Sequence, residues 1–219
     1  PLMCQACDMA TQAMGRNIGV YCGSSSGLTP EFAAEAVALG SALVTGGHGL
    51  VYGGGRIGLM GLIADSVLDS GGQVHGVIPE HLVKAETAHQ GLTTLEIVNS
   101  MHERKARMEA LSVGFIVLPG GFGTFDEVFE ILTWNQLGLI TKPVVFLDGT
   151  GYYARLFEAF EHMISTGFVK ENYRAMMNRA TSVEEAVRIA SSPAPKVDGK
   201  LRNLDVTSTR NDSSSKDFL

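Results

Sequence analysis

The sequence lacks any apolar run long enough to cross a membrane, and it lacks an excess of basic residues. Its 219 residues carry 23 acidic and 17 basic side chains, which gives a formal net charge of -6. Without a broad positive field the chain is not drawn to nucleic acid or to an acidic membrane, so any anion-binding site must be local. The composition therefore disfavours membrane proteins and nucleic-acid-binding proteins.

Cysteine is scarce, and common metal-binding motifs are absent. The three cysteines are Cys4, Cys7 and Cys22, and the single CxxC has no second pair and no histidines at ligand spacing. The metalloprotease motif HExxH does not occur. We therefore expect reduced thiols, a cytoplasmic location, no metal and no other cofactor.

One folded domain is expected from the composition, which is 45% hydrophobic and 18% charged. We assign residues 16–190 to this domain. Residues 1–15 are predicted to be a poorly ordered leader or an expression remnant. Residues 191–219 are rich in Ser, Asp, Lys and Asn, which predicts a polar flexible tail.

Strand-like and helical patterns alternate along the domain. The strand-like runs are apolar without alternation, as in strands buried on both faces. They cover residues 17–22, 50–52, 73–78, 94–98, 114–118, 143–147 and 177–181. Helical patterns cover residues 30–44, 59–70, 101–111, 125–137, 152–166 and 183–190. The alternation predicts an α/β, Rossmann-like, doubly wound parallel sheet of about seven strands with helices on both faces.

Two glycine-rich turns carry the strongest functional signal. Residues 53–61 (GGGRIGLMG) and 119–127 (PGGFGTFDE) each follow a strand-like run and open a helix. Such a turn directs backbone N–H groups at an anion, and ligands of parallel sheets lie beyond the carboxyl ends of the strands. The turns therefore predict a site for a phosphate-bearing ligand, with Gly54 and Gly55 among the contacting residues of the first turn.

The first turn allows two other interpretations. Gly53, Gly55 and Gly58 match GxGxxG, which also occurs in dinucleotide sites. A dinucleotide fingerprint usually follows the first strand, however, whereas this turn follows the second, and the acid at the expected distance, Glu80, follows a proline. Alternatively, the glycines serve only a tight strand-to-helix turn.

The second turn leaves two roles open for Glu127. Gly120, Gly121 and Gly123 permit close backbone approach and positive φ angles. Thr124 is a good N-cap, and Thr124 with Glu127 forms a capping box, which would make Glu127 structural. In the functional alternative, the Glu127 carboxylate serves a ribose hydroxyl or a water molecule beside the ligand.

The segment after the fourth strand-like run adds a cation. Ser100 and Glu103 form a capping box at the start of a predicted helix. Arg104 lies on a mostly apolar stripe of that helix, so it either needs an anionic partner or must extend to the surface. Lys105 and Arg107 point elsewhere on the helix, where solvent can reach them.

Three motifs resemble one known family. YGGGxxGLMG at residues 52–61, MHxRKAxM at 101–108 and PGGxGTxxE at 119–127 look like the motifs of the LONELY GUY (LOG) family. The resemblance covers residues 16–190. It implies a homodimer that hydrolyses the N-glycosidic bond of a nucleoside 5′-monophosphate, either AMP or an N6-modified AMP of the cytokinin type. The products would be the free base and ribose 5-phosphate.

The resemblance also implies roles for individual residues. It makes Arg104 and Glu127 the catalytic pair, and it brings Lys105 and the second turn to the substrate. The turn residues concerned are Gly120, Gly121, Phe122, Gly123 and Thr124. By the same matching, Glu86 and Thr133 contact the ligand.

The chemistry agrees with these residue types. Cleavage of a base from ribose passes through an oxocarbenium-like state with positive charge on the sugar. Glu127 could stabilise that charge, orient the ribose hydroxyls, activate water or form a covalent intermediate, and Arg104 could hold the phosphate or the departing base. A non-catalytic nucleotide-binding module with the same turns is the alternative.

Overall fold

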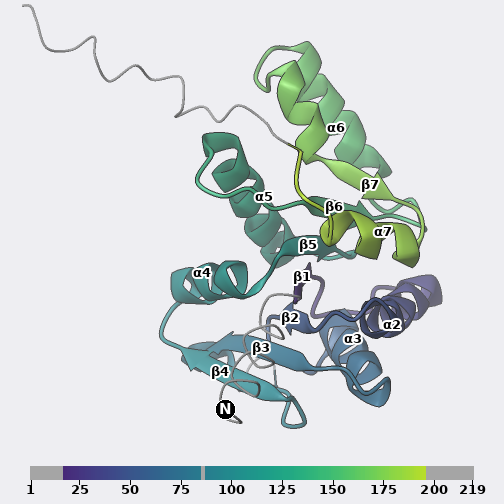
Figure 1. The fold of residues 1–219 in the computed structure, drawn as a ribbon, viewed down its shortest axis with the longest axis vertical. Coiled ribbons are helices and arrows are strands. Elements are labelled where there is room, and N and C mark those ends of the chain that lie inside the picture. Colours follow the sequence, from purple (N-terminus) through teal and green to yellow (C-terminus); the bar gives the residue numbers. More distant parts are fainter. Residues whose placement is uncertain (1–16, 85–86, 196–219) are drawn as a thin grey trace, which may run out of the picture.

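Seven parallel strands form one sheet in the order β4-β3-β2-β1-β5-β6-β7 (Figure 1). A computed structural model describes residues 17–84 and 87–195. The strands are β1 (Ile18–Tyr21), β2 (Leu50–Tyr52), β3 (Val74–Pro79), β4 (Thr94–Val98), β5 (Gly114–Val117), β6 (Val144–Leu147) and β7 (Asn178–Ala180). The predicted fold class is confirmed. The predicted leader lies outside the described residues, as does the predicted tail beyond residue 195.

Helices cover both faces of the sheet, as predicted. They are α2 (Pro30–Thr45), α3 (Gly58–Asp69), α4 (Met101–Leu111), α5 (Phe122–Leu137), α6 (Ala154–Ser165) and α7 (Val183–Ala190), with short 3₁₀ helices η1 (Glu80–Leu82) and η2 (Glu171–Met176). In Figure 1, α4, α5 and α6 lie on one side of the sheet and α2, α3 and α7 on the other. Within the described part of the chain, no helix is long and apolar enough to cross a membrane.

The central strand β1 contributes to an apolar core on each face. Ile18 and Val20 pack into the core formed with α2, α3 and α7. Tyr21 packs into the core on the other face and stacks on Phe115, with ring centroids 5.1 Å apart. Successive side chains of a strand point to opposite faces, so a strand covered on both sides is apolar throughout. Position 19 requires glycine, because a Cβ there would lie 2.5 Å from the Phe115 ring.

The edge strand β4 is tied to its neighbours through Glu96. Arg107 Nε on α4 donates to Glu96 Oε1 at 2.8 Å, and His75 Nε2 on β3 lies 3.2 Å from Glu96 Oε2. Arg107 is therefore ion-paired rather than simply solvated. Burial would raise the pKa of Glu96, but the hydrogen bonds with Arg107 and His75 outweigh it and lower that pKa below its usual value.

Replacing Glu96 with Gln should give a pH-dependent loss of stability. Because the pKa of Glu96 is lowered in the folded state, its ion pair stabilises the fold above the unfolded pKa of about 4.3, and this contribution is lost as the pH falls. We expect a loss of up to about 1 kcal/mol in the free energy of unfolding at neutral pH, since the pair is partly exposed. Urea unfolding of both proteins over a pH series measures this. A difference that stays undiminished at acidic pH would contradict it.

Candidate active site

The carboxyl ends of β1, β2 and β5 meet where the strand order reverses. β1 pairs with β2 on one side and with β5 on the other. Ligands of doubly wound sheets bind in the crevice at such a point. A cavity of about 240 Å³, here called the central cavity, opens there. Its lining is Val20, Cys22, Gly23, Ser24, Gly53, Met60, Leu82, Met101, Arg104, Gly121, Phe122, Gly123, Thr124 and Glu127.

The glycines of the first turn make room for other groups. A Cβ at Gly53 would collide with the Arg104 guanidinium, and a Cβ at Gly58 would collide with the backbone of Ser24. Gly54 and Gly58 also have positive φ angles, 78° and 63°. The first turn therefore seats the guanidinium and packs the start of α3 against the loop that follows β1.

Gly54 and Gly55, predicted to contact the ligand, are not among the residues that line the central cavity. The Gly54 carbonyl accepts a hydrogen bond from His89 N at 2.9 Å, and Gly55 forms a β-bridge with Ala88. The geometry thus agrees with the tight-turn interpretation for these two positions. Their contact with a ligand stays a prediction.

Helix α5 begins at Phe122 rather than at the predicted residue 125. Gly121 is its N-cap, and no side chain caps this end of the helix. The predicted capping box of Thr124 and Glu127 is therefore wrong, because both residues already lie inside the helix. With capping removed as an explanation, Glu127 needs another one.

Open space lies beside the start of α5. A Cβ at Gly120 would collide with Thr124, whereas a Cβ at Gly121 or Gly123 would meet nothing within 4 Å. Gly120, Gly121 and Gly123 permit positive φ angles, but none of them adopts one. The first N–H groups of a helix have no acceptor within it, and that end carries a partial positive charge. This side of the central cavity therefore suits an anion.

Arg104 forms part of the cavity wall and is 4% exposed. Its Nη2 donates to the Gly53 carbonyl at 3.1 Å, and its Nε lies 3.9 Å from Glu127 Oε1. Helix α4 starts as predicted, with the Ser100 side chain accepting a hydrogen bond from Glu103 N. The burial excludes the alternative in which Arg104 extends to the surface.

Glu127 faces Arg104 from the neighbouring helix and is 8% exposed. Because α4 and α5 lie on the same face of the sheet, their side chains meet at the carboxyl end of β1. A buried charge without a partner is very costly, so each member of this pair stabilises the other. One cavity thus combines an ion-paired carboxylate with the N-terminus of a helix.

Lys105 is buried, so the interpretation of Lys105 as a solvated side chain does not hold. Its Nζ lies 3.2 Å from Asp126 Oδ2 and 3.1 Å from Glu130 Oε2. Burial would lower the pKa of Lys105, but the hydrogen bonds with Glu130 and Asp126 outweigh it and raise that pKa. Lys105 therefore links α4 to α5 and is not among the cavity-lining residues. Its contact with the substrate stays a prediction.

Of the two remaining predicted contacts, the structure describes only Thr133, which does not line the central cavity. Thr133 Oγ1 donates to the Phe129 carbonyl at 2.7 Å. Thr133 lines a separate apolar hollow of about 130 Å³, bordered by α5, α6 and η2. Glu86 lies outside the described residues.

Eight cavity-lining residues were not predicted as site residues. They are Val20, Cys22, Gly23, Ser24, Gly53, Met60, Leu82 and Met101. Gly53, Met60 and Met101 fall within the motifs that resemble the LOG family, so the resemblance could have pointed to them. Leu82 belongs to η1, which links β3 to the loop that follows. No sequence pattern marks Leu82 as part of a site.

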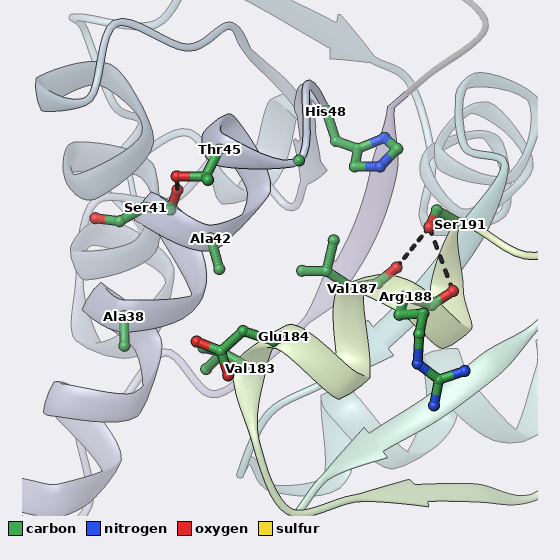
Figure 2. Close-up of a pocket in the computed structure, with 11 residues that line it drawn as sticks. Ala38, Ser41, Ala42, Thr45, His48, Val183, Glu184, Val187, Arg188 and Ser191 are labelled. Carbon is green, nitrogen blue, oxygen red and sulfur yellow. Dashed lines mark hydrogen bonds between the residues drawn. The ribbon is translucent and has the colours of Figure 1, made fainter.

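A larger hollow of about 650 Å³ lies between α2 and α7 (Figure 2). Two hydroxyls at its border bond to the backbone of their own helix, Ser191 to the Val187 carbonyl and Thr45 to the Ser41 carbonyl. The hollow shares no lining residue with the central cavity. Size alone therefore does not identify the site, whereas the charged pair and the helix N-terminus do.

The fold and the cavity define a Rossmann-like α/β protein with a candidate anion site beside a buried carboxylate–guanidinium pair. A family profile described as "Possible lysine decarboxylase" matches residues 60–190. The chain belongs to this family, which is the LOG family.

Named relatives support this assignment. The chain is 46% identical over 171 residues to the "Probable cytokinin riboside 5'-monophosphate phosphoribohydrolase LOGL1" of Oryza sativa subsp. japonica, covering 78% of this chain and 77% of that protein. It is 43% identical over 179 residues to the cytokinin riboside 5'-monophosphate phosphoribohydrolase of Rhodococcoides fascians, covering 81% and 90%.

Solved structures support the fold alone, because their sequence identity is low. The X-ray structure of TM1055 matches with a TM-score of 0.62 at 23% identity, covering 80% of this chain and 97% of that one. The molybdenum cofactor carrier protein of Chlamydomonas reinhardtii matches with a TM-score of 0.59 at 20% identity, covering 80% and 94%.

A comparison of the variants Gly120→Ala and Gly121→Ala should separate the packing role of the second turn from its role in ligand binding. A methyl group at position 120 would lie 2.7 Å from Thr124 Cβ and 2.9 Å from Gly23 N, so we expect a loss of about 1–3 kcal/mol in the free energy of unfolding. A methyl group at position 121 meets open space at a φ of -97°, so stability should change by less than about 0.5 kcal/mol. Gly121→Ala should nevertheless weaken AMP binding, because the added methyl group would occupy the open space beside the start of α5. Urea unfolding and calorimetric titration measure the two effects, and equal stability of the two variants would contradict the packing argument.

Proposed function

We propose that this chain is a phosphoribohydrolase that cleaves the N-glycosidic bond of a nucleoside 5′-monophosphate. The substrate is a cytokinin riboside 5′-monophosphate or AMP, and the products are the free base and ribose 5-phosphate. The observation that carries the proposal is the Arg104–Glu127 pair, with 3.9 Å between Nε and Oε1, in a cavity beside the start of α5. The activity for which the relatives from Oryza sativa and Rhodococcoides fascians are named supports the substrate class.

The central cavity offers separate places for the two charges that this reaction involves. The N–H groups at the start of α5 suit the 5′-phosphate. The Glu127 carboxylate suits the positive charge that develops on the ribose as the base departs. Arg104, bonded to the Gly53 carbonyl, holds that carboxylate in place. Water then adds to the anomeric carbon, and the base leaves with a proton.

The catalytic pair can be tested by substitution. We expect the purified protein to release free base from N6-isopentenyladenosine monophosphate or from AMP, detected by chromatography. Glu127→Gln keeps the shape and removes the charge, so kcat should fall by about 10²- to 10³-fold or more. Arg104→Ala should also abolish turnover, although it leaves a buried carboxylate without its partner, so its folding must be checked by circular dichroism.

Glu103→Gln provides the matched control. Glu103 is adjacent to Arg104, is exposed, and accepts a hydrogen bond from Asn99 N, which glutamine can also accept. We expect near wild-type kcat. Near-normal base release by Glu127→Gln would refute the catalytic assignment. Thermal stabilisation of the wild type by nucleotide without any product would favour a binding module.

We further propose a cytoplasmic homodimer. The scarcity of cysteine supports the location. The apolar hollow bordered by α5, α6 and η2 supports the dimer, because Phe129 and Met163 on it are 38% and 37% exposed. Thr133, a predicted ligand contact, lines the same hollow. A second copy that packs on this face would bury these apolar side chains. It would also bring Thr133 of one chain toward the central cavity of the other.

Met163→Glu should disrupt such a dimer, because it introduces a charge into an apolar contact. We expect light scattering to report a dimer for the wild type and a monomer for the variant, with loss of base release. Val37→Glu is the control, since Val37 is 43% exposed and lies on α2, on the opposite face of the sheet. A wild-type monomer with full activity would overturn the proposal.

A further inference from the structure

Two consecutive tyrosines in the loop after β6 donate hydrogen bonds to the second glycine turn. Tyr153 Oη donates to the Leu118 carbonyl at 2.6 Å, and Tyr152 Oη donates to the Gly120 carbonyl at 2.7 Å. Neither tyrosine lines the central cavity. Both hydroxyls therefore donate to the backbone of the second turn and not into the central cavity.

The two tyrosines are held in place by residues outside the second turn. The Tyr153 backbone N–H donates to Asp148 Oδ1 at 2.8 Å, and Arg179 Nη2 on β7 lies 2.7 Å from Asp148 Oδ2. The Tyr152 ring meets Phe32 of α2 edge to face, with centroids 5.7 Å apart. The positions of the two tyrosines are therefore set by contacts that do not involve the second turn itself.

Peptide planarity passes this constraint to the ligand side. The Gly120 carbonyl and the Gly121 N–H belong to one planar peptide group and point in opposite directions. The bond from Tyr152 therefore fixes the direction of the Gly121 N–H. Packing restricts this peptide only on the Gly120 side, where a Cβ would collide with Thr124, whereas a Cβ at Gly121 would meet nothing within 4 Å. The bond from Tyr152 adds a constraint on the open side.

We propose that Tyr152 is a positioning residue for phosphate recognition: its hydroxyl orients the Gly120–Gly121 peptide so that the substrate phosphate meets a preformed N–H donor. The inference rests on the proposed function for the identity of the substrate. Tyr153 holds the carbonyl of Leu118, the residue that directly follows β5. Preorganised donors bind an anion more tightly than donors that must be ordered on binding.

The test compares Tyr152→Phe with the wild type. Loss of one orienting hydrogen bond should weaken competitive inhibition by ribose 5-phosphate about three- to tenfold and raise KM for AMP by a similar factor, with kcat at saturation retained. Inhibition by adenine, which lacks the phosphate, should not change. In the ligand-free protein, the Gly121 amide signal should shift in a ¹⁵N–¹H NMR spectrum, which loss of a direct phosphate contact would not cause.

Ser112→Ala is the matched control. It removes a buried hydroxyl that donates to the Met108 carbonyl at 2.8 Å, at the opposite end of the strands. We expect unchanged inhibition by ribose 5-phosphate. Unchanged inhibition in Tyr152→Phe, or equal weakening for adenine, would overturn the positioning role. If the wild type binds ribose 5-phosphate in calorimetry but releases no base, the proposed function fails and the comparison of phosphate affinities still decides the role of Tyr152. If it binds none, both proposals fail.

Discussion

The buried contact between Arg104 and Glu127 constrains the structure around it. The guanidinium rests on the Gly53 carbonyl, at a position where any Cβ would collide with it. The carboxylate reaches the same cavity only because α5 begins at Phe122, which puts Glu127 in the second turn of the helix. Two helices on one face of the sheet and a turn at the end of β2 must therefore be positioned together.

The two glycine turns look alike in sequence but serve different physical needs. In the first turn, the position of a missing side chain is occupied by other protein groups, by Arg104 at Gly53 and by the Ser24 backbone at Gly58. In the second turn, the space beside Gly121 and Gly123 is open. Open space beside the N-terminus of a helix is what an anionic ligand requires. The second turn is therefore the better candidate for contact with phosphate.

Local patterns in the sequence predicted the fold well, because the strands are buried on both faces and read as continuous apolar runs. Residues 17–22 were predicted as a strand, and β1 covers Ile18–Tyr21. The start of α5 was predicted wrongly because Thr124 and Glu127 carry a capping signal, whereas the actual N-cap, Gly121, carries no side chain.

The interactions that the sequence could not reveal are those between helices. The sequence does not show that Lys105 is buried, because its partners, Asp126 and Glu130, lie on another helix. The approach of Arg104 to Glu127 was expected only through the family resemblance, and its dependence on Gly53 could not be seen in any local pattern. Spacing within one helix shows which residues share a face, but it does not show what that face meets.

Pairing of the charges also determines how this site can attract an anion. The charge of Arg104 is matched by Glu127, that of Lys105 is matched by Asp126 and Glu130, and the chain as a whole carries a net charge of -6. Attraction for a phosphate must then come largely from oriented backbone dipoles, whose effect is confined to the first turn of the helix and depends on direction. A site of this kind is sensitive to the angle of a single peptide group. That sensitivity explains why hydroxyls that never reach the central cavity bear on its affinity.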